Sequence, residues 1–445
     1  MGVPLALCLV ALACAAPAWA DDVYVTNHVP LSLEQPSGTV SQFDVGAGGA
    51  LAPKSPAAVA AGFRPRGVAV SPDGQSVYVT NNGEHAVSQY DVVAGGALAP
   101  KSPATVDTGL VPTGVAVSPD GQSVYVTTSW SSVFQYDVGG DGALTPKSPA
   151  TVAAGPIPTG VAVSPDGLSV YVTNLLSNDV SQYDVGAGGA LAPKSPQPTV
   201  RAVLAPIGVA VSPDGQSVYV TNFGTGVDDP EFRGFVSQYD VGAGGALAPK
   251  SPAFVEAAQG AEGIGVSPDG QSVYVAAGVV FQYDVGGDGA LAPKSPATVA
   301  AGLIPTGVAV SPDGQSVYVT NQLSDDVSQF DVGAGGALSP KSSAAVAAGD
   351  QPFGIAVRPD VFPTIGELID SVEALGLPRG IENGLVKKLE NAQRNLDEGD
   401  TANACEKLAS FIERVKAQSG KKIDVADADD LIADAEAIRA AEGCA

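Results

Sequence analysis

Residues 67–81 read Gly-Val-Ala-Val-Ser-Pro-Asp-Gly-Gln-Ser-Val-Tyr-Val-Thr-Asn, and close copies of this stretch recur along most of the 445-residue chain. The first four residues favour a β-strand. Ser-Pro-Asp-Gly favours a tight turn because proline presets φ and glycine accepts a positive φ, and Ser-Val-Tyr-Val-Thr alternates like a second strand. The turns begin at Ser71, Ser118, Ser164, Ser212, Ser267 and Ser311, with an altered copy at Arg358-Pro359-Asp360. Their spacings of 44 to 55 residues match one four-stranded blade of a β-propeller.

Two further strands complete each repeat. Val-Ser-Gln-Tyr-Asp-Val, as at residues 180–185, predicts the third strand, and Ala-Leu-Ala-Pro-Lys after a glycine-rich turn predicts the fourth. Because its proline cannot donate a hydrogen bond to a central ladder, we expect the fourth strand at the outer edge of the blade. The aspartates of the turns and third strands and the lysines of the fourth strands repeat seven times, and we interpret them as structural.

A count of the strands predicts how the ring closes. The mature chain begins with a second strand at residues 23–26, and a seventh first strand appears only at residues 354–357. The last strand should therefore complete the first blade. The sequence predicts an all-β seven-bladed β-propeller of four-stranded blades over residues 21–360, closed by pairing of its N- and C-terminal strands.

The repeated Tyr-Val-Thr-Asn segment also carries a family resemblance. It stands at residues 24–27, 78–81, 171–174, 219–222 and 318–321. The segment resembles the repeat that names the YVTN β-propeller family, and Gly-Val-Ala-Val-Ser-Pro-Asp-Gly resembles the seven-bladed lactonase-like propellers. The resemblance implies the fold. For function it implies either a cell-surface protein of unknown activity or a lactonase or lactonising enzyme.

The composition changes after Asp360, where apolar residues recur at helical spacing in four short stretches. Residues 361–445 are therefore predicted to form a small all-α domain with one core. The run from Ala404 to Val415, followed by Gly420 and a late Cys444, resembles the FIMAH domain found at the C-termini of diverse secreted bacterial proteins. That resemblance implies attachment or stability rather than catalysis.

Residues 1–20 are predicted to be a signal peptide, because an apolar run precedes Ala18-Trp19-Ala20, which fits a cleavage site before Asp21. A lipoprotein site at Cys14 stays an alternative. The mature protein is therefore expected outside the cytoplasm, in the periplasm, at the cell surface or secreted. Its two cysteines, Cys405 and Cys444, are expected to form a disulfide, the alternative being two unpaired thiols.

The charge and the residue inventory exclude several classes of partner. A net charge of −25 repels nucleic acid and anionic lipid, and no apolar run after the signal is long enough for a transmembrane segment. No cofactor is predicted, and no metal site. Phosphate-binding loops, zinc signatures and Gly-x-Ser-x-Gly elbows are missing from the sequence.

The loops between second and third strands and the connections between blades share one face of a propeller, and here they vary from blade to blade. On this variable face His28 lies in the first loop, Glu84 and His85 in the second, and Arg64 and Arg66 in the connection between those blades. A histidine base and an arginine that holds an oxyanion would suit lactone hydrolysis. The alternatives are solvated loop residues, or a metal site of both histidines with Glu84.

The variable face offers a second group of candidates, for ligand binding. Asp228, Asp229, Glu231 and Arg233 occupy an irregular loop of the fifth repeat, and Trp130 could stack on a sugar or a peptide. Counting the whole face, twelve acidic residues stand against four arginines. We expect a binding scaffold that recognises a glycan, a peptide or a protein surface through this face. The alternative function is a lactonase-like hydrolase or a lactonising enzyme.

Overall fold

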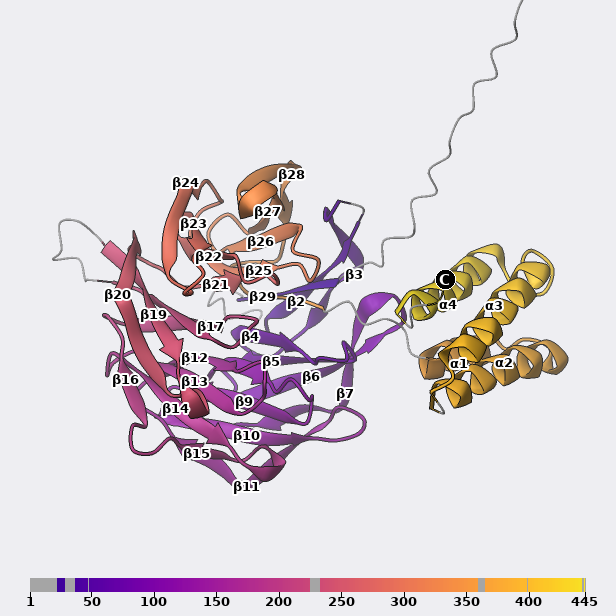
Figure 1. Ribbon diagram of the computed structural model, residues 1–445, viewed down its shortest axis with the longest axis horizontal. Helices are drawn as coiled ribbons and strands as arrows, with labels where there is room; N and C mark the ends of the chain where they lie inside the picture. Colours follow the sequence, from indigo (N-terminus) through magenta and orange to yellow (C-terminus); the bar gives the residue numbers. More distant parts are fainter. Residues whose placement is uncertain are drawn as a thin grey trace, which may run out of the picture. The chain divides into compact units, whose positions relative to one another are not determined.

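The computed structural model describes residues 22–28, 37–46, 48–224, 233–358, 365–397, 399–441 and 444 (Figure 1). These residues divide into two compact units, one before residue 360 and one after it. The predicted signal peptide and the candidates Asp228, Asp229 and Glu231 lie outside the described residues. No helix in the described ranges is long and apolar enough to cross a membrane.

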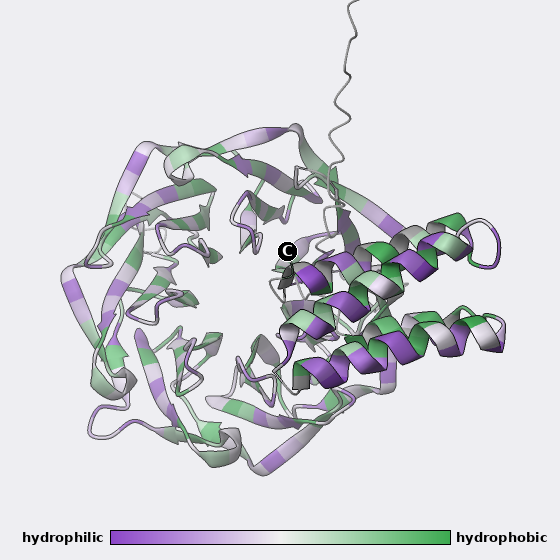
Figure 2. Cartoon of the chain, turned by 45° about the vertical axis from the view of Figure 1, so that its right-hand side comes forward, coloured by the Kyte–Doolittle hydropathy of each residue, from purple (hydrophilic) through white to green (hydrophobic). Residues whose placement is uncertain are grey.

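The first unit is a ring of seven antiparallel blades, as the strand count predicts (Figures 1 and 2). From the axis outwards, blade 1 consists of β29 (Pro352–Val357), β1 (Asp22–Asn27), β2 (Thr39–Val45) and β3 (Leu51–Ala60). Blades 2 and 3 are β4 (Pro65–Val70), β5 (Ser76–Asn81), β6 (Ala86–Val93), β7 (Ala97–Asp107), and β8 (Pro112–Val117), β9 (Ser123–Thr128), β10 (Ser132–Val138), β11 (Leu144–Ala153). Blades 4 and 5 are β12 (Pro158–Val163), β13 (Ser169–Asn174), β14 (Asp179–Val185), β15 (Leu191–Pro193) with β16 (Thr199–Arg201), and β17 (Pro206–Val211), β18 (Ser217–Asn222), β19 (Arg233–Val241), β20 (Leu247–Ala258). Blades 6 and 7 are β21 (Ile264–Val266), β22 (Ser272–Ala277), β23 (Val279–Val285), β24 (Leu291–Val299), and β25 (Pro305–Val310), β26 (Ser316–Asn321), β27 (Asp326–Val332), β28 (Leu338–Ala347).

Blade 4 differs from the prediction of four continuous strands, because its outer edge is split into β15 and β16. The lysine of this edge is followed by Ser-Pro-Gln-Pro, so a second proline, Pro198, stands between the two segments. Proline has no backbone N–H to donate, and the ladder resumes only at Thr199.

Repeated polar side chains join each blade to the next. The tyrosine of every second strand donates its hydroxyl to a glycine-rich turn of the following blade, as from Tyr78 to the Gly142 carbonyl at 2.7 Å. The lysine of every fourth strand is 6–8 % exposed and pairs with the third-strand aspartate of its own blade, as Lys101 does with Asp91. The same Lys101 ammonium donates to the Asp141 carbonyl of the next blade at 2.6 Å. The repeated charges are therefore structural, because they satisfy one another where the blades meet.

The ring closes between the ends of the propeller sequence. Strand β1 pairs with β29, with Val23 opposite Val357 and Val25 opposite Ile355, which confirms the predicted closure. The seventh blade then contacts the first through the repeated bonds. Tyr318 donates to the Gly49 carbonyl at 2.8 Å, and Lys341 donates to the Gly48 carbonyl at 2.6 Å.

Blade 1 departs from the repeat at the closing strands. In blade 2 the backbone N–H of Ser76 donates to the Ser71 hydroxyl, and the other complete blades repeat this serine pair. The equivalent residues in blade 1 are Asp22 and Arg358, whose Oδ2 and Nε lie 3.0 Å apart. The other Asp22 oxygen lies 2.5 Å from the Lys54 ammonium. Burial raises the pKa of Asp22 in spite of the two cations, which shows how costly this buried charge is.

We expect Asp22→Ser and Arg358→Ser each to destabilise the propeller by about 2 kcal/mol, because each leaves a charge without its partner. The double variant should cost clearly less than the sum, since it restores the serine pair of the other blades. Urea unfolding of the four proteins, followed by tyrosine fluorescence, measures the coupling. Strictly additive losses would contradict a closure held by this ion pair.

The described residues of the second unit form four helices, as predicted: α1 (Ile365–Ala374), α2 (Arg379–Asp397), α3 (Thr401–Gln418) and α4 (Val425–Ala441). Each contributes one apolar face to a common core that includes Leu368, Leu389, Phe411 and Leu431. Figure 2 shows the alternation of hydrophobic and hydrophilic residues around these helices. Cys405 and Cys444 form the predicted disulfide, with Cα atoms 5.6 Å apart.

Candidate functional site

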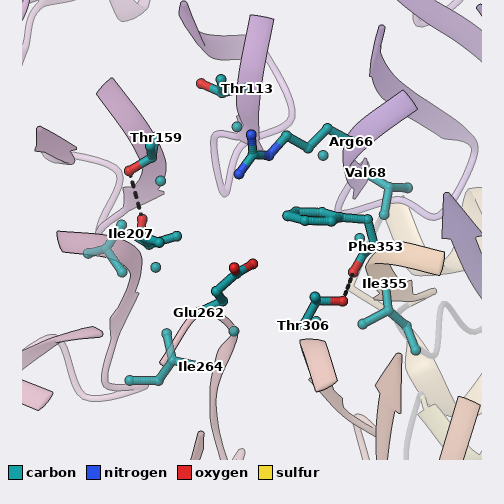
Figure 3. A pocket seen from close by; sticks show the side chains of 18 of the residues that line it. Arg66, Val68, Thr113, Thr159, Ile207, Glu262, Ile264, Thr306, Phe353 and Ile355 are labelled. Carbon is teal, nitrogen blue, oxygen red and sulfur yellow. Dashed lines mark hydrogen bonds between the residues drawn. The ribbon is translucent and has the colours of Figure 1, made fainter. Parts of the chain in front are cut away.

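A cavity of about 260 Å³ lies around the ring axis, where the innermost strands of the blades begin (Figure 3). Each blade lines it with the same segment, which is a variable residue, then a glycine, then an aliphatic residue. The variable residues are Arg66, Thr113, Thr159, Ile207, Glu262, Thr306 and Phe353. Because every innermost strand follows a connection on the variable face, the cavity lies at that end of the axis.

A β-bulge and a glycine place these segments. In six blades the register between the first and second strands shifts at the variable residue, as between Pro65 and Val68 in blade 2. A bulge re-aims side chains, and bulges recur beside active sites. The glycine allows neighbouring strands to approach closely: a Cβ on Gly208 would lie 2.3 Å from the Glu262 carbonyl oxygen. The variable side chains are therefore left to line the cavity.

Most polar groups around the cavity are already paired. In six blades the threonine of the second strand accepts from the glycine amide, as Thr80 does from Gly67 at 2.8 Å. The same hydroxyl donates to the variable residue of the next blade, as Thr80 does to the Thr113 carbonyl at 2.9 Å. The lining threonines donate their own hydroxyls across blades, as Thr306 does to the Phe353 carbonyl at 3.2 Å.

Arg66 and Glu262 differ from these satisfied groups. They come from blades 2 and 6 and point toward one another from opposite sides of the cavity (Figure 3). Among the described residues no ion pair joins them, and the Glu262 Oε2 atom is buried without a hydrogen-bond partner. The Arg66 guanidinium carbon lies 4.6 Å from the centre of the Phe353 ring. The cavity thus holds one cation and one carboxylate, each able to accept a partner from a ligand.

Burial controls the protonation of both groups. It raises the pKa of Glu262 above its usual range, and the Arg66 charge only partly opposes the rise. Burial lowers the pKa of Arg66, and Glu262 opposes that shift. Each charge would be better solvated in bulk water, so the pair is held apart at a cost in stability. Such unpaired, perturbed groups facing a cavity are typical of functional sites.

His28 packs against Phe353, one of the residues that line the cavity. Its imidazole is 9 % exposed and stacks on Phe353, with ring centroids 5.3 Å apart and planes within 4°. Burial lowers the pKa of His28 to about 4, and the charges of Arg66 and Arg64 add to the shift. The neutral ring therefore holds Phe353 in place without repelling Arg66.

We expect His28 to make folding stability depend on pH. In the unfolded chain His28 takes up a proton near pH 6.5, whereas in the folded protein it stays neutral down to about pH 4. The stability that the neutral His28 contributes is therefore complete above pH 6.5 and is lost as the pH falls toward 4. The expected loss in the free energy of unfolding is about 3 kcal/mol, because a difference of one pKa unit corresponds to about 1.36 kcal/mol. The stability difference between wild type and His28→Gln at pH 7 and pH 4.5 measures it. His85→Gln, a change at an exposed histidine, is the matched control, and equal pH dependence of wild type and His28→Gln would refute the effect.

The sixth blade departs from the repeat next to Glu262. Its second strand has Ala276 where the six other blades have threonine, and Ala261 replaces the proline before the variable residue. The innermost strand β21 starts only at Ile264. This blade lacks the bond between the glycine amide and the threonine hydroxyl, and its first and second strands are joined here by backbone bonds, from the Glu262 amide to the Ala276 carbonyl and from the Ala276 amide to the Gly263 carbonyl, both at 3.0 Å. The departures coincide at the blade that carries the carboxylate.

The other residues that the sequence suggested lie elsewhere on the variable face. Arg64, Glu84 and His85 are exposed and do not line the cavity. Trp130 is 68 % exposed in the loop between β9 and β10, and Arg233 lies 3.7 Å from Glu256. The structure thus places Arg66 in the cavity and His28 beside it, in contact with Phe353. The loop of the second blade lies outside the cavity.

Glu262 and Phe353 were not singled out from the sequence, although Glu262 is among the twelve acids of the face. Aligning the seven repeats exposes the signal, because one column, which precedes a glycine and in six repeats follows a proline, reads Arg, Thr, Thr, Ile, Glu, Thr and Phe. It changes chemical type from blade to blade while its neighbours stay nearly constant. A column that varies inside an otherwise uniform repeat is a candidate site.

Comparisons with known families agree with this architecture. A family model described as a seven-bladed β-propeller lactonase matches residues 37–187 and 243–353, more than half of the chain. A model of the FIMAH domain matches residues 363–440. No curated protein matches the chain.

Solved structures share the propeller. A putative 6-phosphogluconolactonase from Bacteroides fragilis superposes with a TM-score of 0.60 at 19 % identity, over 76 % of this chain and 98 % of its own. The periplasmic gluconolactonase of Pseudomonas aeruginosa gives 0.59 at 20 % identity, over 76 % and 99 %. Hydrazine synthase of Kuenenia stuttgartiensis gives 0.51 at 21 % identity, over 69 % and 94 %. Likeness at these identities shows a common fold, which serves proteins with different names and reactions.

Proposed function

Because the chain belongs to the family of seven-bladed lactonase β-propellers, as its repeats suggested, we propose that it binds a small lactone in the axial cavity and hydrolyses it. The opposed, unpaired Arg66 and Glu262 carry this proposal. The cavity of about 260 Å³ is slightly below the range of roughly 300–1,000 Å³ typical of drug-sized ligands, so the ligand is small. Relatives named as gluconolactonase and 6-phosphogluconolactonase suggest sugar lactones as the first compounds to test.

In this mechanism Arg66 donates hydrogen bonds to the carbonyl oxygen of the lactone, and Glu262 takes a proton from a water molecule. The water oxygen attacks the carbonyl carbon, and negative charge develops on the oxygen that faces the guanidinium. The ring C–O bond then breaks, and Glu262 returns the proton to the leaving alkoxide. The product is the open hydroxy acid. A raised pKa makes Glu262 a better base than an exposed carboxylate.

Turnover of a lactone panel tests the proposal. Glucono-δ-lactone and simple γ- and δ-lactones should be opened faster than in buffer, with proton release followed by a pH indicator. Arg66→Gln should lower kcat/KM by about 10²–10³-fold, the usual cost of a lost oxyanion donor. Arg201→Gln, at an exposed arginine of the same face, should leave the rate unchanged. Wild type that opens no lactone in the panel would contradict the proposal.

The second-blade candidates stay a hypothesis of their own. In the mechanism above Glu84 and His85 take no part, so His85→Ala should retain turnover. Loss of turnover in His85→Ala would instead bring the loop of the second blade into the site.

A binding role for the variable face is favoured by its exposed apolar side chains. Trp130, Leu176 and Leu323 are 57–68 % exposed in loops between second and third strands. Ile304 is 48 % exposed at a φ of 53°, a conformation that costs a β-branched residue energy without burying its side chain. A glycan, peptide and protein array, probed with wild type and Trp130→Ala, would detect such recognition. If the variable face retains no ligand from the array, hydrolysis remains the one proposed function.

Location outside the cytoplasm is part of the proposal. The Cys405–Cys444 disulfide supports it, because disulfides persist in oxidising compartments. The mature N-terminus should be Asp21 when the full-length gene is expressed in a host that exports it. Mass spectrometry of the exported protein tests this, and an uncleaved N-terminus would contradict the signal peptide.

A further inference from the structure

Building on the proposed lactone site, we infer that the cavity selects an unphosphorylated lactone and excludes phosphate esters, and that Glu262 is the residue responsible for the exclusion. The inference depends on which hydrogen-bond donors remain free around the ring axis, and on which charge faces them.

A bound phosphate needs several donors, which proteins usually supply as cations and as free backbone amides. The cavity lining includes the backbone amides of seven glycines, one from each blade. Six of them donate to second-strand threonines at 2.8 Å and cannot turn to a ligand: Gly67, Gly114, Gly160, Gly208, Gly307 and Gly354. At most the amide of the seventh lining glycine, Gly263, is left for a ligand, and one amide is too few for a phosphate cradle.

The side chains offer no substitute. The lining threonines use their single hydroxyl hydrogens on backbone carbonyls of neighbouring blades, as Thr113 does on Pro158 at 2.9 Å. Among the side chains that line the cavity the remaining donor is Arg66, which also has to meet the lactone carbonyl. A doubly charged phosphate would keep most of its oxygens unsatisfied in a partly dehydrated space.

Glu262 adds repulsion to this shortage of donors. It points into the cavity opposite Arg66, so a ligand that spans the cavity must place its far end against the carboxylate (Figure 3). Hydroxyl groups satisfy that position because they can donate to the unpartnered Oε2. When the lactone ring is seated on Arg66, a phosphate at this far end faces a like charge.

The apolar lining supports the same class of ligand. Ile207 adjoins Glu262 in the ring order, and Phe353 adjoins Arg66, so each charged group has an apolar neighbour. A sugar-sized lactone presents C–H groups as well as hydroxyls, and both surfaces find complements here. The cavity thus suits a neutral, hydroxylated ring.

The test compares glucono-δ-lactone with its 6-phosphate at 0.15 M salt, where long-range repulsion by the acidic protein is screened. For the wild type, kcat/KM for the 6-phosphate should be lower than kcat/KM for glucono-δ-lactone by a factor of roughly 100 or more, since unsatisfied polar groups give strong discrimination. Equal or faster hydrolysis of the 6-phosphate would overturn the inference.

Calorimetric binding of the product acids separates this inference from the proposed hydrolysis. Even if neither lactone is turned over, so that the proposed function fails, gluconate should bind more tightly than 6-phosphogluconate. The reverse order, equal affinities or no binding of either acid would overturn the inference.

Glu262→Thr tests the assigned residue, because threonine occupies this column in three other blades. The variant should bind 6-phosphogluconate about 10-fold more tightly than wild type does, as the like charge is removed. Asp350→Asn removes one exposed negative charge from the same face and should leave the affinity unchanged. An equal gain in both variants, or no gain in Glu262→Thr, would show that Glu262 does not exclude phosphate.

Discussion

Replacing Glu262 by glutamine is expected to lower kcat for lactone hydrolysis by about 10²–10⁴-fold, the usual contribution of a positioned general base. Glutamine keeps the size and polarity of the side chain but cannot accept the proton of the attacking water. Because Arg66 still holds the lactone carbonyl, KM should change much less than kcat. Initial rates, corrected for the spontaneous opening of the lactone, give both parameters.

The pH profile of the same variant distinguishes a base from a structural carboxylate. Glu262 must be ionised to act, and burial raises its pKa above the usual 4.5. Wild-type kcat/KM should therefore rise with pH through a pKa above 4.5, and the residual rate of Glu262→Gln should not show that rise. Asp350→Asn, which removes an exposed carboxylate, should keep the wild-type profile. A Glu262→Gln enzyme with wild-type kcat would remove Glu262 from the chemistry.

Removing the disulfide is expected to destabilise the helical unit by about 4 kcal/mol in the chain-entropy model, for a sequence separation of 39 residues. The bond ties the first turns of α3 to Cys444, three positions after the end of α4, so it restrains two of the helices that form the core. The four helices share one small core, and small cores often need such a cross-link. Unfolded chains without the bond gain conformational freedom, which is the main cause of the loss.

Hydrogen exchange in full-length Cys405→Ser/Cys444→Ser protein measures this effect against an internal control. Amides of α2 and α3 should exchange faster than in wild type, whereas those of β5, β9 and β13 should be unchanged, because the described propeller contains no cysteine. Two reactive thiols per chain in native, unreduced wild type would contradict the disulfide. Unchanged protection of α2 and α3 in the variant would contradict its contribution to stability.

The architecture could be predicted because its signals are local and repeated. Ser-Pro-Asp-Gly reports a turn wherever it occurs, and proline in the fourth strand reports an edge, so each repeat identifies the same four strands. Counting them was enough to predict that residues 354–357 pair with residues 23–26, which the structure confirms. The aspartate and lysine ladders were correctly interpreted as structural, since their sevenfold repetition follows the strands and not one site.

The candidate site was predicted only in part. Arg66 and His28 were selected for their charge and their neighbouring loops, and Arg66 does face the cavity. Glu84 and His85 were selected by the same reasoning, but a position on the variable face says nothing about distance from the axis. The side chains of second-to-third strand loops, such as His85, are exposed there, whereas the bulged residues of the innermost strands line the cavity.

The sequence by itself therefore determined the number of blades, the order of their strands, the closing pair and the helical tail with its disulfide. Only the tertiary structure placed Arg66 opposite Glu262, which stand 196 positions apart in the chain, and stacked His28 on Phe353. The reason is geometric. A repeat specifies each blade through contacts between neighbouring residues and blades, but residues three or four blades apart meet only across the axis of the closed ring.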